Sequence, residues 1–179
     1  MIYVFLANGF EEVEAFTPVD LLRRAECQVK TVGVGGKTVT GSHGIAVTAD
    51  IAQSEVITDD MEMVVLPGGM PGTLNLEKNP IVTASVRYCL ENGLPVGAIC
   101  AAPSILGHLG ALKGKRAVCF PGFEEQLLGA QVLQDPVCTD GNITTARGAG
   151  VAVDFALELV RIMAGEETAG RIRASIQCI

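Results

Sequence analysis

The strongest candidate for chemistry in this chain is a cysteine at the boundary between a strand pattern and a helix pattern. Cys100 follows the apolar run Val96–Ile99 and precedes Ala101, Ala102 and Pro103, residues that favour the start of a helix. A thiol on such a sharp turn, near the positive end of a helix, is favoured as the thiolate. We therefore interpret Cys100 as a nucleophile.

The other cysteines carry no comparable signal. The sequence has six cysteines, and none of them forms a CxxC pair or a metal-like spacing with the two histidines. We expect four of them to be small buried apolar residues, namely Cys27, Cys89, Cys119 and Cys138. The pattern predicts neither a metal site nor a disulfide framework.

A carboxyl group is the second candidate. Glu14 closes the segment 9–14 and lies between the apolar residues Val13 and Ala15. A carboxyl held beside a thiolate in a dry pocket has a raised pKa, so it can donate a hydrogen bond to the sulfur or move protons. Glu11 and Glu12 are interpreted as ordinary acids of a first helical turn, which the helix dipole favours.

Backbone N–H groups complete the candidate site. Gly68 and Gly69 follow the buried strand Met63–Leu66, and glycines there permit a close backbone approach. The N–H groups of Gly69 and Ala101 are candidates for an oxyanion site, whereas the alternative for the glycine pair is a plain tight turn.

Neither histidine is spaced to serve as a base for the thiol. His108 lies eight residues after Cys100, which is about 12 Å along a helix, and His43 falls in a predicted loop at 41–44. The glycines at 35–36 and 148–150 match no nucleotide-binding pattern. We therefore expect no nucleotide and no cofactor.

The elements that position these residues alternate between apolar strands and helices. Such alternation predicts a mainly parallel sheet covered on both faces, an α/β sandwich in three layers. Turns at the carboxyl ends of parallel strands meet at one edge, so the turns at 8–9, 67–69 and Cys100 are expected to form one pocket. Strands are expected at Ile2–Ala7, Val29–Val34, Met63–Leu66, Val96–Ile99, 116–119, 137–139 and Ile143–Ala146, a hairpin at 39–47, and helices at 12–25, 79–92, 101–109, 151–163 and Glu166–Ser175.

Composition limits the class of protein. The chain has 179 residues, of which 49% are hydrophobic and 18% charged, and its net charge is -7. These values favour one folded domain over residues 1–179 and disfavour stable binding to nucleic acid, which requires a basic face. No apolar run reaches the length of about 20 residues that spans a bilayer, and no basic leader precedes the first strand. We expect no membrane contact and a cytoplasmic location.

In combination, the segments 9–14, 64–69, 98–103 and 145–150 resemble the ThiJ/PfpI superfamily, in the branch of the Parkinson-disease-associated protein deglycase. The resemblance covers essentially the whole chain. It implies a flavodoxin-like sandwich, a homodimer, a reactive cysteine at Cys100 and a protonated glutamate partner at Glu14.

Three positions depart from the patterns of that superfamily. Protease-like members carry a histidine after the cysteine, and Ala101 in its place argues against a peptidase. The deglycase branch often has a histidine where this chain has Phe120, so proton transfer falls to Glu14 or to a water. His43 replaces a frequent arginine, so the anion site that the resemblance implies at the dimer interface, with Arg24, is expected to be weaker.

The resemblance leaves competing functions. The first is a cofactor-independent glyoxalase or deglycase, protective against carbonyl and oxidative stress, in which Cys100 attacks methylglyoxal, glyoxal or their protein adducts. The alternative is a redox-sensing chaperone in which Cys100 oxidises to a sulfinic acid without significant turnover. A role in thiamine or nucleotide metabolism, which older superfamily names suggest, has no strong phosphate site to support it.

Overall fold

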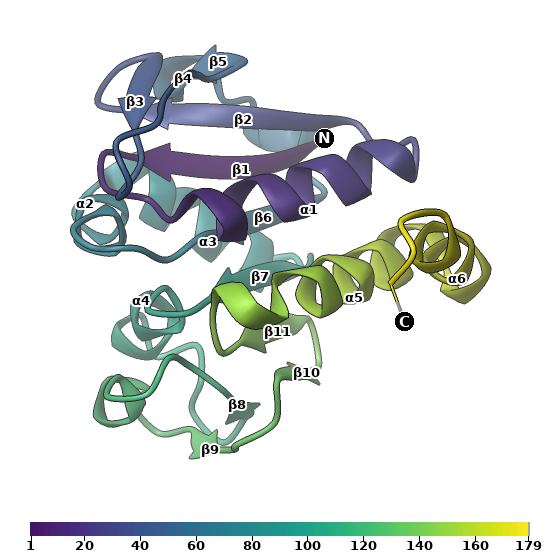
Figure 1. The fold of residues 1–179 in the computed structure, drawn as a ribbon. Helices are drawn as coiled ribbons and strands as arrows, with labels where there is room; N and C mark the ends of the chain where they lie inside the picture. Colours follow the sequence, from purple (N-terminus) through teal and green to yellow (C-terminus); the bar gives the residue numbers. More distant parts are fainter. Residues whose placement is uncertain (179) are drawn as a thin grey trace.

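The computed structural model describes residues 1–178, and a seven-stranded sheet forms its centre (Figure 1). The strand order is β10-β11-β7-β6-β1-β2-β5. All neighbours pair in parallel except β10 and β11, which form an antiparallel hairpin. The mainly parallel sheet is therefore confirmed. The strands are β1 (Ile2–Ala7), β2 (Val29–Val34), β5 (Ile51–Ala52), β6 (Met63–Leu66), β7 (Val96–Ile99), β10 (Val137–Asp140) and β11 (Ile143–Ala146).

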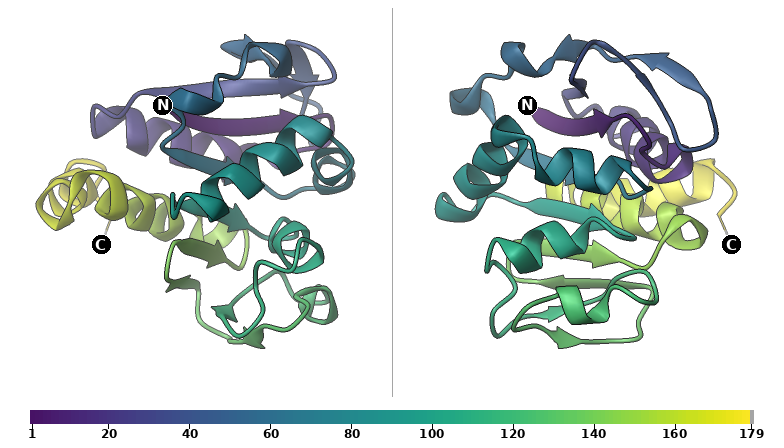
Figure 2. Two further views of the ribbon diagram at one scale, coloured as in Figure 1. Left: turned by 180° about the vertical axis from the view of Figure 1, so that it is seen from behind. Right: turned by 90° about the vertical axis from the view of Figure 1, so that its left-hand side faces the viewer.

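Helices cover both faces of the sheet, as Figure 2 shows. One face packs on α1 (Glu12–Arg24), α5 (Ala152–Ala164) and α6 (Glu166–Ser175), and the other packs on α2 (Gly72–Glu77), α3 (Pro80–Glu91) and α4 (Pro103–His108). Each face has its own buried apolar core, because side chains of a strand alternate between the two faces. The predicted three-layer α/β/α sandwich is confirmed. Within residues 1–178, no helix combines the length and apolarity needed to cross a membrane.

Short strands and 3₁₀ helices lie outside the central sheet. The predicted hairpin is present as β3 (Thr38–Thr40) and β4 (Ala46–Thr48). The strand predicted at 116–119 is present over its first two residues only: β8 (Arg116–Ala117) pairs outside the main sheet with β9 (Gln131–Val132). Its chain turns away because the Val118 N–H donates to the Thr145 hydroxyl at 2.9 Å. Short 3₁₀ helices lie at Gln53–Glu55, Thr58–Asp60, Glu124–Gln126 and Ala149–Val151.

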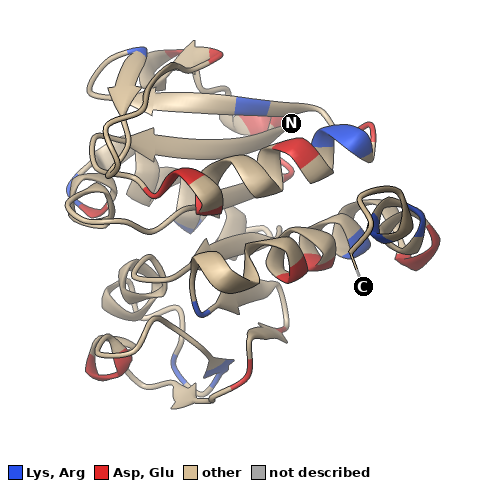
Figure 3. Ribbon diagram, viewed as in Figure 1, with Lys and Arg blue, Asp and Glu red and all other residues tan. Residues whose placement is uncertain are grey.

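Helix α1 starts against the end of β6, and this contact sets the position of the candidate site. The Glu11 N–H donates to the Gly68 carbonyl at 2.9 Å, and the Glu11 carboxylate caps the Glu14 N–H at 2.7 Å. Acidic residues lie in the first turn of α1 and basic residues in its last turn (Figure 3), as the helix dipole favours.

Candidate active site

Cys100 lies on a strained turn at the carboxyl end of β7. Its φ angle is 66°, in the left-handed region that costs a residue with a side chain about 1–2 kcal/mol. The Cys100 N–H donates to the Ala146 carbonyl at 2.9 Å, and the Cys100 carbonyl accepts the Phe120 N–H at 2.8 Å. Sheet neighbours therefore hold the turn, and the nucleophile-elbow geometry expected from the sequence is present.

The helix after Cys100 is shorter than the sequence indicates. The predicted helix at 101–109 is wrong at its start, because Ala101 and Ala102 form a turn and α4 begins at Pro103. Six residues give a weak dipole, so the individual N–H groups next to the sulfur matter more than the helix as a whole.

The structure brings Glu14 directly to Cys100. The Glu14 side chain is 1% exposed and lies close enough to the Cys100 thiol for each group to shift the pKa of the other. Its Oε2 accepts the Gly68 N–H at 2.9 Å, and the nearby Ala149 N–H helps to lower the pKa of the carboxyl. Gly68 lies between the two side chains and touches both. A Cβ on Gly68 would lie 2.6 Å from Cys100 Cβ and 2.7 Å from Glu14 Oε2. A glycine at this position is thus a condition for the pair.

Burial separates the pKa values of the two groups, so near neutral pH the Cys100 thiol holds its proton while Glu14 gains or loses one. Burial raises the pKa of Glu14 to about 7, against the opposing effect of the nearby Cys100 side chain. Burial, and next the charge of Glu14, raises the pKa of the Cys100 thiol to about 12. Burial of the thiol, and next the charge of Glu14, thus outweigh the N–H groups that lower its pKa, so the expectation that the helix terminus favours the thiolate is wrong for the resting site. When Glu14 is protonated, its charge vanishes, and the carboxylic acid can donate to the sulfur.

The raised pKa of Glu14 predicts an acid-side stability bonus. A folded-state pKa of about 7 against 4.5 means that the folded protein holds the proton more tightly, by about 3 kcal/mol at pH below 4.5. This stabilisation is lost as pH rises from 4.5 through 7. Relative to Glu14→Gln, the wild-type free energy of unfolding should therefore fall by about 3 kcal/mol between pH 4.5 and 8. Urea denaturation of both proteins at several pH values measures it, and parallel pH profiles would contradict it.

The predicted oxyanion donors both lie at the sulfur. The N–H groups of Gly69 and Ala101 lie near the Cys100 thiol and lower its pKa. Gly69 has a φ angle of 89°, and a Cβ there would lie 2.4 Å from the Glu11 nitrogen, so this close backbone approach requires glycine. That the same two groups hold a substrate oxyanion stays a prediction.

Phe120 occupies the mouth of the site. Its side chain is 47% exposed. A Cβ placed on Gly148 would lie 3.2 Å from Phe120 Cδ2 and 3.7 Å from Glu14 Oε1, so only this glycine separates the ring from the carboxylate. Both histidines are engaged elsewhere: His108 hydrogen bonds to Glu77, and His43 hydrogen bonds to Glu12. Glu14 is thus the titratable side chain that shifts the pKa of the Cys100 thiol.

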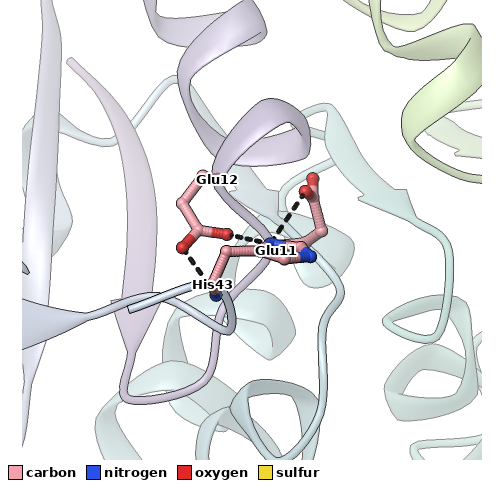
Figure 4. Close-up of side chains that lie close together, drawn as sticks. All are labelled: Glu11, Glu12 and His43. Carbon is pink, nitrogen blue, oxygen red and sulfur yellow. Dashed lines mark hydrogen bonds and ion pairs between the residues drawn. The ribbon is translucent and has the colours of Figure 1, made fainter. Parts of the chain in front are cut away.

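A cluster of Glu11, Glu12 and His43 anchors the hairpin loop to α1 (Figure 4). Glu12 accepts the His43 N–H at 2.8 Å, His43 Nδ1 at 2.7 Å and the Ser42 hydroxyl at 3.3 Å. Although burial raises the pKa of Glu12, these hydrogen bonds hold it at about 2, and they raise the pKa of His43. The three ligand atoms lie within 4.8 Å and could hold a cation. The cluster has two structural roles in this chain: Glu12 and His43 anchor the hairpin loop, and the Glu11 carboxylate accepts the Glu14 N–H at the start of α1.

Arg24 and His43 are not brought together within one chain. Arg24 pairs with Asp20 at 2.8 Å at the carboxyl end of α1, whereas His43 binds Glu12 at its amino end. The helix between them is about 18 Å long at 1.5 Å per residue. Each side chain already faces a carboxylate, and the anion site at a dimer interface stays a prediction.

Sequence reasoning missed the segment that closes the site from the far side. The Ala149 N–H reaches Glu14, and Gly148 lies against its carboxylate. The sequence predicts the glycines at 148 and 150 only as part of the family resemblance and as a pattern that fits no phosphate loop. Their position after β11, which neighbours β7 in the sheet, is the signal that indicates a role at the site.

Comparison with known proteins places these features in one family. The DJ-1/PfpI family matches residues 1–162. Drosophila melanogaster dj-1beta is 36% identical over 92% of this chain and 89% of its own length, and its crystal structure matches with a TM-score of 0.95 at 32% identity, covering 99% and 97% of the two chains. A deglycase of Pyrococcus abyssi is 30% identical over 90% of this chain and 98% of its own. An oxidized DJ-1 from Toxoplasma gondii matches with a TM-score of 0.94 at 32% identity, covering 98% and 97%. The fold, the elbow at Cys100 and these relatives together make the chain a member of the DJ-1/PfpI family.

Proposed function

We propose that the protein is a cofactor-independent enzyme that acts on methylglyoxal, glyoxal or their protein adducts. The observation that carries the proposal is the close approach of Cys100 and Glu14 on either side of Gly68, which places a nucleophile beside a buried proton carrier. The pKa of Glu14, raised by burial to about 7, suits a group that both accepts and donates protons at neutral pH. Relatives in the family that carry the name deglycase support this class of activity.

The geometry supports a balanced sequence of steps for methylglyoxal. As the Cys100 sulfur forms a bond to the aldehyde carbon, the Glu14 carboxylate takes the thiol proton and passes it to the carbonyl oxygen, giving a hemithioacetal. During this attack, the Gly69 and Ala101 N–H groups stabilise the developing negative charge on oxygen. The Glu14 carboxylate then moves the hydrogen of that carbon to the neighbouring carbon, while the hydroxyl proton passes to the neighbouring oxygen. The product is a thioester of lactate.

Water completes the reaction. It attacks the thioester, the carbon–sulfur bond breaks, and lactate leaves while the Cys100 thiol regains its proton. One carbon is oxidised and its neighbour reduced, so methylglyoxal plus water gives lactate without an external oxidant or reductant. The chemistry therefore needs only groups that this chain supplies.

The direct test is product formation by the purified protein. We expect lactate from methylglyoxal and glycolate from glyoxal without added cofactor, and deuterium at C2 of the lactate when the reaction is run in D₂O, because Glu14 exchanges its proton with solvent. NMR spectroscopy measures both the products and the label. Absence of lactate above the rate in buffer, with a thiol that titration shows to be reduced, would contradict the proposal.

A second candidate is a redox-sensing chaperone, and the surroundings of the sulfur favour it specifically. Two N–H groups and a protonated Glu14 could hold the oxygens of a Cys100 sulfinic acid. The related Toxoplasma gondii structure is of an oxidized protein. Suppression of aggregation that depends on peroxide, without turnover of carbonyl compounds, would favour this function over the first.

We also propose that the protein is a homodimer in the cytoplasm. Val13 on α1 is 50% exposed, and Ile45 on the adjoining hairpin is 55% exposed. Large apolar side chains exposed on neighbouring elements are typical of a surface that another chain covers. The family resemblance of this chain supports a second copy as that partner.

A further inference from the structure

We infer that a pocket beside the Cys100–Glu14 pair is a subsite for the apolar, carboxylate-ending tail of a larger α-oxoaldehyde substrate. The inference rests on the proposed function and names the substrate class for which the site is suited. The pocket has a volume of about 490 Å³ and is lined mainly by Phe120, Pro121, Pro136, Arg147, Gly148 and Val151. Pockets of roughly 300–1,000 Å³ hold drug-sized ligands, so this space exceeds what three-carbon methylglyoxal requires.

The pocket adjoins the segments that hold the reacting groups, although Cys100 and Glu14 are not among the residues that line it. Phe120, on one wall, donates its N–H to the Cys100 carbonyl at 2.8 Å. On the other wall, Arg147 follows Ala146, whose carbonyl accepts the Cys100 N–H at 2.9 Å. Gly148 lies against the Glu14 carboxylate. A substrate whose aldehyde reaches Cys100 can therefore extend its tail into the pocket.

The lining specifies an apolar tail. Phe120, Pro121, Pro136 and Val151 offer carbon surfaces, and the Phe120 ring is 47% exposed. A tail that covers this ring removes apolar surface from water, which favours binding. The Phe120 side chain is apolar and carries no charge at any pH. The pocket is therefore suited to longer aliphatic substituents.

The end of the tail is specified by a single charge. Among the described residues 1–178, Arg147 is the only charged one that lines the pocket. Its guanidinium makes one hydrogen bond, to the Gln134 carbonyl at 3.4 Å, and no ion pair within residues 1–178. A guanidinium presents five N–H donors in a planar fork that fits a carboxylate.

Glu14 does not oppose an anionic tail. Burial raises the pKa of Glu14 to about 7. Near neutral pH, the Glu14 carboxyl is therefore uncharged in a large fraction of the molecules. The acidic groups Glu11 and Glu12 are turned toward the helix start and the hairpin loop, where they accept hydrogen bonds from Glu14 N–H and His43.

The test compares two seven-carbon substrates that differ only at the end of the tail. These are 6,7-dioxoheptanoate, which ends in a carboxylate, and 2-oxoheptanal, which ends in a methyl group. We expect Arg147→Gln to lower kcat/KM for the carboxylate about tenfold relative to that for 2-oxoheptanal, mainly through KM. Phe120→Ala should lower kcat/KM for both substrates about fivefold relative to methylglyoxal. The matched control is Arg87→Gln, since Arg87 is exposed on α3 and lines none of these walls, and its ratio should equal that of the wild type.

Binding without chemistry separates the two proposals. The Cys100→Ser protein should bind 6-oxoheptanoate more tightly than 2-heptanone in calorimetry, and adding Arg147→Gln should remove the difference. If this preference holds while methylglyoxal gives no lactate, the subsite stands and the proposed function fails. If methylglyoxal is turned over, but Arg147→Gln leaves both the preference and the kcat/KM ratio unchanged, the subsite is overturned and the function stands. An equal loss in Arg87→Gln would also overturn it, because net charge would then explain the preference.

Discussion

Cys100→Ser is expected to lower kcat/KM for methylglyoxal by about 1,000-fold or more. A serine hydroxyl is far less acidic than a thiol, and the base available to it is Glu14, whose pKa burial raises only to about 7. That carboxylate is too weak to ionise an alcohol, so the hydroxyl remains a poor nucleophile. The turn itself should persist, because Cys100 is held through its backbone N–H and carbonyl. Lactate formation measures the activity, and thermal unfolding checks that the variant is folded.

A second cysteine serves as the control for this substitution. Cys178 is half-buried near the carboxyl end of the chain, where its sulfur accepts Arg173 Nη1 at 3.4 Å. Cys178→Ser makes the same chemical change away from the site and should retain wild-type turnover. Residual activity of more than a few per cent in folded Cys100→Ser would contradict the mechanism, because turnover would then not require the thiol.

The layers of the fold were predictable because each central strand is a continuous apolar run. β1, β6 and β7 are fully buried, so their sequences lack the polar alternation of an exposed face. β5 and α2 were missed because a two-residue strand and a six-residue helix are too short for a periodic signal. The error at 116–119 has a different cause. Its apolar residues are buried, but Val118 pairs with a side chain instead of a ladder, which periodicity does not reveal.

The residues of the candidate site were predictable where the local sequence identifies them. The boundary between a strand and a turn identifies Cys100, and the family resemblance identifies Glu14. The raised pKa of Glu14 was predicted, but the raised pKa of the Cys100 thiol was not, because it depends first on the burial of the sulfur in the folded chain. The same holds for Gly148, whose contact with the Glu14 carboxylate arises from the pairing of β11 with β7.

Gly68→Ala is the substitution expected to break the site without touching either reacting side chain. The added Cβ would lie 2.6 Å from Cys100 Cβ, 2.7 Å from Glu14 Oε2 and 3.0 Å from the Ile99 carbonyl. Cys100 is fixed by its turn, so the Glu14 carboxyl must move and lose the 2.9 Å bond from the Gly68 N–H. A displacement of about 1 Å is enough to lower turnover about 100-fold. The overpacking should also lower the free energy of unfolding by about 1–3 kcal/mol.

Gly170→Ala separates this effect from a general response to an added methyl group. Gly170 is exposed in α6, and a Cβ there meets no atom within 4 Å. Alanine is the better helix former, so this variant should gain about 0.5–1 kcal/mol of stability and keep its activity. In Gly68→Ala, the acid-side stability bonus of Glu14 should shrink together with turnover, because a displaced carboxyl is less buried and its pKa returns toward 4.5. Full activity with an unchanged pH profile of stability would show that the two side chains do not depend on the space that Gly68 leaves.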